Sequence, residues 1–261
     1  VTGIGLLFPG GGYWGLTVGL LLLASSARWP VIGLGMLLVG VLAPPPAIEA
    51  PAGWRGVETH WAMASGSRDL MQQLARQQAL TEQVARDDTS RVLIFPETSL
   101  GHWAAPSSWL WADTARLAQA RGQTLILGAE WMADDAVFTG SEHYENIAGR
   151  LDAAGALAPL YRQLMPVPFS MWRPGSKAGA LPAWFTPQMA LIDGQSTAFL
   201  ICYEQLLIWP VLVAMSQGPE VLVGMANDWW ARDTRIPAIQ RTALTAWARL
   251  FGTKLVISQN L

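Results

Sequence analysis

Polar side chains that can take part in catalysis follow three apolar runs of this sequence. Glu97 closes the run RVLIFPE, Cys202 closes STAFLIC, and Asn227 and Asp228 close EVLVGMAND. In α/β proteins reactive groups collect at the ends of buried strands, because the sheet fixes them while loops build the cleft. A thiol needs a partner that takes its proton, and donors for the oxyanion that forms when it attacks a carbonyl. The pattern predicts a site in which Cys202 is a nucleophile and Glu97 its base.

The neighbours of Cys202 could complete this site. The backbone N–H of Tyr203 is the expected first oxyanion donor, since it follows the nucleophile. Glu204 could modulate the thiol or make a structural hydrogen bond, and Asn227 and Asp228 could line the cleft or close a turn. On these residues alone Cys202, the only cysteine of the chain, could also be a small buried apolar residue.

Other kinds of site are not indicated by the sequence. The three histidines, His60, His102 and His143, would allow a cysteine–histidine hydrolase, but no motif of that class surrounds Cys202. The histidines and acidic residues show no metal-ligand spacing, so no metal is predicted. The glycine-rich run PGGGYWG lacks the Gly-Lys-Ser/Thr ending of a phosphate loop, and a net charge of −2 gives no basic surface for nucleic acid.

Strands and helices that would hold these residues alternate along most of the chain. Short apolar runs predict strands at 57–64, 91–98, 124–131, 196–203, 220–228 and 255–260. Helices are predicted at 69–86, 109–122, 204–215 and 238–251, with a kink at Pro210, and a hairpin-like pair of strands is predicted about 153–156. Strands that alternate with helices argue for an α/β fold with a buried sheet, over a domain at 56–261.

The first part of the chain, residues 1–48, has a different composition. Residues 1–27 and 29–48 carry no charge, and each stretch reaches the ~20 apolar residues that a membrane span needs. We therefore expect two transmembrane helices, the end of a longer membrane region, with the lipid bilayer as partner. Under the positive-inside rule Arg28 would lie in the cytoplasm, which places the following domain on the periplasmic side of the inner membrane.

Four motifs occur in an order that resembles the nitrilase, or carbon–nitrogen hydrolase, superfamily. They are FPET (95–98), YRQLMPVPF (161–169), ICYE (201–204) and ANDWW (226–230). The chain is most similar to the apolipoprotein N-acyltransferase branch, and its run MPVPFSMWRPGS resembles the TraB family of plasmid conjugal transfer. Over residues 56–261 the resemblance implies a four-layer α-β-β-α sandwich preceded by transmembrane helices, and a chain truncated at its C-terminus.

The resemblance also implies a Glu-Lys-Cys triad and no cofactor. Glu97 falls on the general base and Cys202 on the nucleophile that carries an acyl group as a thioester. The triad lysine would stand two residues after Tyr161, where this chain has Gln163, and Met171 replaces an acidic residue of the acyltransferases. A neutral amide stabilises an oxyanion less well than an ammonium, and losing one such donor costs about 100- to 1000-fold in rate.

Two substitutes for the lysine and two functions stay open. Arg162 would need a local twist, because neighbours on an extended segment face opposite sides, and Lys177 lies in a loop that could swing into the cleft. In the first function the protein is a thiol acyltransferase or amidase that acts on an acyl-lipid or an amide. In the second it is a non-catalytic, membrane-anchored relative that binds proteins of the conjugation machinery.

Overall fold

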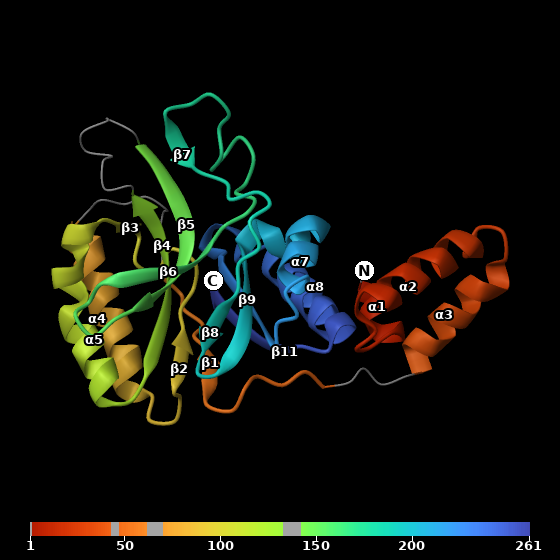
Figure 1. The fold of residues 1–261 in the computed structure, drawn as a ribbon, viewed down its shortest axis with the longest axis horizontal. Helices are drawn as coiled ribbons and strands as arrows, with labels where there is room; N and C mark the ends of the chain where they lie inside the picture. Colours follow the sequence, from red (N-terminus) through yellow and green to blue (C-terminus); the bar gives the residue numbers. More distant parts are fainter. Residues whose placement is uncertain (1, 43–46, 62–69, 133–141) are drawn as a thin grey trace.

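Four layers of secondary structure, in the order helix, sheet, sheet, helix, make up most of the molecule (Figure 1). The computed structural model describes residues 2–42, 47–61, 70–132 and 142–261. Helices α4 (Leu70–Arg86) and α5 (Ser108–Ala120) cover the outer face of one sheet. Helices α7 (Ile208–Met215) and α8 (Ile236–Phe251) cover the outer face of the other. The predicted α/β sandwich is confirmed.

The first sheet joins a parallel part to an antiparallel part. Its order is β1-β2-β4-β5-β6, with β3 beside β4 and β7 beside β5. β1, β2 and β4 run parallel, whereas β4, β5 and β6 run antiparallel. The strands are β1 (Trp54–Gly56), β2 (Val92–Ile94), β3 (His102–Trp103), β4 (Thr124–Met132), β5 (Glu142–Leu151), β6 (Leu157–Arg162) and β7 (Ala178–Ala180).

The second sheet has the order β11-β10-β9-β8. Its strands are β8 (Ala190–Ile192), β9 (Gln195–Ile201), β10 (Val221–Asn227) and β11 (Lys254–Asn260). β9, β10 and β11 are parallel, and Ile201 pairs with Met225. Because parallel strands end at the same edge, Cys202 and Asn227 leave the sheet side by side.

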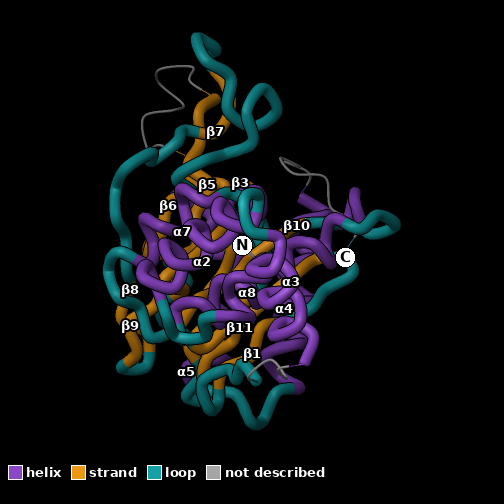
Figure 2. The backbone as a smooth tube through the Cα atoms, turned by 90° about the vertical axis from the view of Figure 1, so that its right-hand side faces the viewer, coloured by secondary structure: helices purple, strands orange, loops and turns teal. Residues whose placement is uncertain are grey.

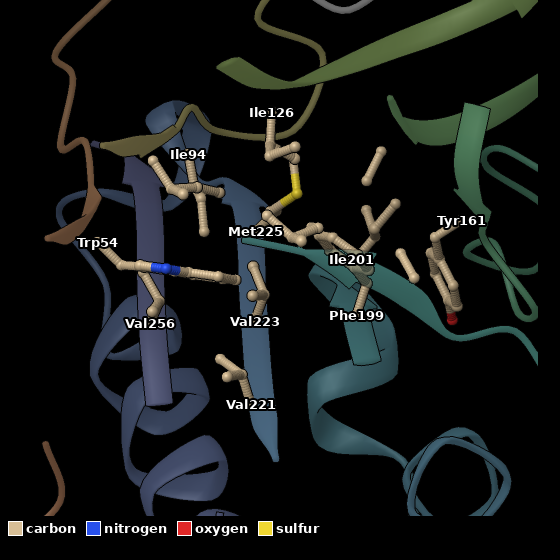
Figure 3. Close-up of a cluster of buried hydrophobic side chains, with 14 of the residues drawn as sticks. Trp54, Ile94, Ile126, Tyr161, Phe199, Ile201, Val221, Val223, Met225 and Val256 are labelled. Atoms are coloured by element: carbon tan, nitrogen blue, oxygen red, sulfur yellow. The ribbon is translucent and has the colours of Figure 1, made fainter. Parts of the chain in front are cut away.

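Apolar side chains fill the spaces between the layers. Between the two sheets lie side chains from both, among them Ile94, Ile126, Phe199, Ile201, Val223 and Met225 (Figure 3). Alternate residues of β9, Ala198 and Leu200, face α7 and α8 instead. Because both faces of these strands are buried, their sequences read as continuous apolar runs, which is why the sequence indicates them clearly.

Three helices precede the sandwich: α1 (Thr2–Leu7), α2 (Gly12–Ser26) and α3 (Pro30–Leu42). α1 packs on α8, where Ile4 is buried and a Cβ atom on Gly5 would lie 2.3 Å from the carbonyl oxygen of Ala246. α2 and α3 form a hairpin that extends away from the sandwich (Figure 1). Figure 2 views the molecule from the side of this hairpin.

In the described part of the chain no helix has the length and apolar character that crossing a membrane requires, so the two predicted transmembrane helices are not confirmed. α2 and α3 contain 15 and 13 residues. They are about 22 and 20 Å long, against about 30 Å of hydrocarbon in a bilayer. The first uncharged stretch is divided beside Pro9, where Gly10 and Gly12 take φ angles of 71° and 52°, because the left-handed conformation ends a helix.

Two further predictions differ from the structure. A strand was expected at 57–64, but β1 lies before this range, at Trp54–Gly56. Within 57–61 only an isolated bridge joins Thr59 to Asn260, and 62–64 lie outside the described residues. The helix expected at 204–215 is divided into the 3₁₀-helix η2 (Cys202–Leu206) and α7. Pro210 causes no kink, because it lies in the first turn of α7, where its missing N–H breaks no helical bond.

Candidate active site

Cys202 lies at the turn from β9 into η2 and is partly exposed. Its φ angle is 50°, which is uncommon for a residue with a side chain and costs on the order of 1–3 kcal/mol. Strain of this kind persists only where the surroundings impose it. The backbone N–H of Tyr203 lowers the pKa of the thiol, so this predicted oxyanion donor lies beside the reacting atom.

Glu204 stabilises the backbone turn at Cys202 through its hydrogen bonds. Its buried carboxylate accepts backbone N–H bonds from Ile201 (2.8 Å), Leu164 (2.6 Å) and Met165 (3.1 Å). The hydroxyl of Tyr161 donates to both of its oxygens at 3.0 Å. Glu204 and Tyr161 therefore join the nucleophile turn to the segment after β6, and of the two roles open for Glu204 the structure supports the structural hydrogen bond.

Glu97 follows β2 and is buried against the thiol. Its Oε1 accepts from Nδ2 of Asn146 at 2.7 Å, and its Oε2 accepts from the backbone N–H of Asn227 at 3.0 Å. The carboxylate and the thiol of Cys202 are close enough for each to shift the pKa of the other. Gly128 of β4 allows the backbone at Glu97 to lie this close to the strand, because a Cβ at position 128 would lie 2.6 Å from the Cα of Glu97.

Burial controls the protonation of both groups. It raises the pKa of Glu97 to about 7, against the lowering effect of the bonds from Asn146, Asn227 and Cys202. Burial, followed by the charges of Glu97 and Asp228, raises the pKa of Cys202 well above its usual value. At neutral pH the site therefore holds a protonated thiol beside a partly ionised carboxylate, which is able to receive the thiol proton.

Gln163 is buried at the position of the family lysine and takes a different role. Its Nε2 donates to the carbonyl oxygen of Ile201 at 3.0 Å, and its Oε1 accepts from Nδ2 of Asn146 at 2.9 Å. The side chain thus links the ends of β6 and β9 and brings no charge. Neither proposed substitute supplies one. Arg162 pairs with Glu145 at 2.6 Å on the opposite side of the strand. Lys177 comes just before β7, where its carbonyl oxygen accepts from the N–H of Glu142 at the start of β5.

Asn146 on β5 is the central residue that strand-end reasoning missed. It is fully buried, and its amide nitrogen bridges Glu97 and Gln163. The sequence did contain a signal for it. Tyr144, Asn146 and Ala148 alternate along the strand and therefore share one face, with Asn146 in the middle. A buried amide on such a face requires polar partners.

Asn227 and Asp228 line the same site. Asn227 donates from Nδ2 to Oγ1 of Thr98 at 2.8 Å, in addition to its backbone bond to Glu97. Asp228 accepts from Nε2 of Gln259 at 3.3 Å, and burial raises its pKa to about 6. In the orientation that satisfies both of its amide atoms, Gln240 donates to Asp228 at 2.6 and 3.1 Å. Its other amide atom lies 4.0 Å from Sγ of Cys202.

The histidines and Met171 have other contacts. His60 lies 3.7 Å from Glu58, His102 lies 2.9 Å from Glu130, and His143 lies 3.3 Å from the carbonyl oxygen of Gly179. These contacts give no support to a cysteine–histidine pair. Met171 accepts a backbone bond from Ala180 in the loop before β7. Within the described ranges, no group of three or more histidine, cysteine or acidic residues could hold a metal ion.

Two curated proteins are similar to the whole chain. It is 36% identical over 270 residues to the probable conjugal transfer protein TraB of Sinorhizobium fredii, and 35% identical over 270 residues to the conjugal transfer protein TraB of Agrobacterium fabrum. The chain spans 66% and 61% of the lengths of these relatives. No family model matches the chain.

Solved structures of an amidase from Nesterenkonia sp. share the fold. A cysteine-to-serine mutant of this nitrilase-superfamily amidase has a TM-score of 0.55 at 17% identity, over 80% of this chain and 78% of that one. A cysteine-to-alanine mutant in complex with butyramide has a TM-score of 0.56 at 17% identity, over 82% and 79%. The likeness shows a nitrilase-like α/β fold.

Proposed function

Because the chain is a relative of the TraB conjugal transfer proteins and has a nitrilase-like fold, we propose that its site performs thiol-dependent acyl transfer from an amide or an acyl-lipid. One observation carries the proposal. The buried carboxylate of Glu97 is held by Asn146 and by the N–H of Asn227 against the thiol of Cys202. A base beside a thiol on a constrained turn is what nucleophilic catalysis by cysteine requires.

The reaction has two stages. Glu97 takes the thiol proton as Sγ attacks the carbonyl carbon, and the N–H of Tyr203 stabilises the oxyanion. When the C–N or C–O bond breaks, Glu97 returns the proton to the leaving amine or alcohol, and an acyl-thioester remains on Cys202. Water then releases the acid, or an amine takes the acyl group. Glu97 receives the proton of the attacking molecule and passes it to the Cys202 sulfur as the C–S bond breaks, which restores the thiol.

A test for the acyl-thioester follows from these roles. Wild-type protein treated with p-nitrophenyl butyrate should gain one butyryl group by intact-protein mass spectrometry, and hydroxylamine should remove it. Cys202→Ala should gain none, and Glu97→Gln should acylate about 100-fold more slowly, because its base is gone. Absence of an adduct on wild-type protein that iodoacetamide still alkylates would contradict the proposal.

A second candidate function is non-catalytic. The observation that favours it is the uncharged Gln163, whose amide joins Asn146 to Ile201 and leaves the site without the family cation. In this function the site binds proteins of the conjugation machinery. Plasmid transfer by cells whose full-length protein carries Cys202→Ala separates the two: unchanged transfer at equal protein level supports binding, and lost transfer supports catalysis.

We also propose that α2 and α3 contact the inner membrane, with the sandwich on the periplasmic side. Arg28 is the only charged residue in 2–42. Many apolar side chains of the hairpin are exposed, including Trp14, Leu21, Trp29, Val31, Leu34, Leu37, Leu38, Val41 and Leu42. Exposed apolar surface of this extent marks a contact with lipid or protein. Wild-type protein should float with phospholipid vesicles, and Leu34→Glu/Leu38→Glu should not. Wild-type protein that stays in the dense fraction would contradict the proposal.

A further inference from the structure

Negative charge gathers around Cys202 without a basic partner. The charges of Glu97 and Asp228 both act on the thiol, and Asp228 also acts on Glu97. Among the ion pairs of the described residues, none joins a lysine or an arginine to either carboxylate. Arg241 reaches Asp228 only through the amide of Gln259. Buried charges are normally paired, so within the described residues the two carboxylates leave a position that favours a cation.

The neighbouring basic side chains interact with other groups. Arg162 binds Glu145, and Arg241 lies 3.5 Å from Glu58. Arg76 is buried, but its charge acts on Glu130. Lys254 lies farther away, at the start of β11, and donates to Gln195 at an exposed position. None of these residues is placed to balance the two carboxylates beside the thiol.

A buried acceptor in the same site also lacks a donor. Asn146 uses its amide nitrogen on Glu97 and Gln163, and its Oδ1 is buried with no hydrogen-bond partner. Gln163 turns its oxygen Oε1 towards the amide nitrogen of Asn146 and directs its Nε2 to the carbonyl oxygen of Ile201, so no bond from Gln163 reaches Oδ1 of Asn146. A buried amide oxygen without a partner is an acceptor that a donor of a ligand can satisfy, and Oδ1 of Asn146 belongs to the residue that holds Glu97.

We propose that the site takes ligands that carry a positive charge, and that the ligand's ammonium or guanidinium lies beside Glu97, Asn146 and Asp228. An ammonium has three N–H donors and no acceptor. It can satisfy Oδ1 of Asn146 and a carboxylate oxygen together while it balances the charge. The inference rests on the proposed function for the reaction itself and adds a substrate class: compounds whose cation lies near the reacting carbonyl.

Cys202 reports on this preference directly, since it is the only cysteine of the chain. We would compare three methanethiosulfonate reagents of similar size: 2-aminoethyl (cationic), 2-hydroxyethyl (neutral) and 2-sulfonatoethyl (anionic). Each rate is divided by the rate for the urea-unfolded chain. The cationic reagent should be favoured over the anionic one by about 10-fold or more, because two nearby carboxylates attract it. Ratios within two-fold of each other, or a preference for the anion, would overturn the proposal.

Variants test which groups cause the preference. Asp228→Asn should remove most of it, and so should Gln163→Lys, which places a cation inside the chain. The matched control is Asp233→Asn, because the side chain of Asp233 is 93% exposed and its loss changes the net charge equally. A preference that falls equally in Asp233→Asn and Asp228→Asn would show a general surface effect and overturn the assignment.

A second measurement does not depend on the thiol. n-Butylammonium should raise the melting temperature of wild-type protein more than 1-butanol does, and Asp228→Asn should lose this difference. Equal effects of the two compounds on wild-type protein would overturn the inference. Absence of an acyl-thioester would remove only the proposed reaction, so the two ideas fail separately.

Discussion

Glu97 is half ionised near neutral pH, because burial raises its pKa to about 7. The thiol of Cys202 keeps its proton over the same range, since burial and the charges of Glu97 and Asp228 raise its pKa well above the usual value. Reactivity at this site therefore depends on an ionised Glu97 that accepts the thiol proton. It does not depend on a thiolate that is already present.

The pH dependence of alkylation tests this dependence on Glu97. With iodoacetamide, a neutral reagent, the rate at Cys202 should rise as pH passes about 7 in the wild-type protein. In Glu97→Gln this rise should vanish, and the rate above it should fall by about 10-fold or more. The measurement is the fraction of alkylated protein against time by mass spectrometry. A Glu97→Gln profile that matches wild type would show that the thiol reacts without this base.

Asn146 tunes the same carboxylate. Its N–H bond lowers the pKa of Glu97, so Asn146→Leu should raise that pKa and move the rise in alkylation to higher pH. Gln163 also loses a donor in this variant, so the free energy of unfolding should fall by about 1–3 kcal/mol. The alkylation profile and urea unfolding give the two readings. A profile that is unmoved or moves to lower pH would show that Asn146 does not hold Glu97.

At the scale of elements, close contacts between backbones position the site. Gly128 allows β4 to approach the segment that carries Glu97, and Glu204 joins η2 to the segment after β6. α8 carries Gln240, which binds Asp228, and α1 packs against α8 at Ala246. The first helix of the chain is therefore part of the support of the site.

A pair of glycine substitutions tests the contact between α1 and α8. Gly5→Ala should lower the free energy of unfolding by about 1–3 kcal/mol, because its Cβ would overlap the carbonyl of Ala246. Gly3→Ala in the same helix is the control, since no atom lies within 4 Å of its Cβ. It should be neutral or stabilising by up to about 1 kcal/mol. Urea unfolding of both variants is the measurement, and equal effects would exclude tight packing at Gly5.

At the scale of the whole molecule, enclosure of the site by both sheets makes stability depend on pH. Glu97 and Glu204 have pKa values of about 7 and about 8 in the folded protein, raised from 4.5. At pH values between 4.5, the ordinary pKa, and these raised pKa values, the folded state binds more protons than the unfolded state. The free energy of unfolding therefore decreases as pH rises through this interval, by the linkage of protonation to folding.

Urea unfolding at a series of pH values checks this decrease. Wild-type protein should lose stability as pH rises from about 4.5 towards about 7 and 8. Glu97→Gln should show a smaller loss, because the glutamine does not titrate. Stability that increases over this interval in wild type would contradict the burial of these two carboxylates.

Much of the sandwich could be predicted, because a strand that is buried on both faces has a continuous run of apolar residues. The strands β4, β9, β10 and β11 each contain an unbroken apolar stretch, namely LIL, AFLI, VLVGMA and LVI, and Glu97, Cys202 and Asn227 stand where such stretches stop. The N-terminal part was harder. Apolar composition indicated two long spans, whereas Gly10 and Gly12 divided the first of them through their backbone conformation.

The sequence by itself determined which strands are buried and that a thiol and a carboxylate leave them at their ends, because local polarity decides which segments can be enclosed. Only the tertiary structure decided the partners of these groups. Asn146 reaches Glu97 across 49 positions, and the N–H of Asn227 reaches it across 130. The amide of Gln163 likewise binds Ile201, 38 positions away, and supplies no charge. The first of these bonds depends on the order of strands within one sheet, and the other two depend on how the two sheets pack face to face, which no local pattern of residues records.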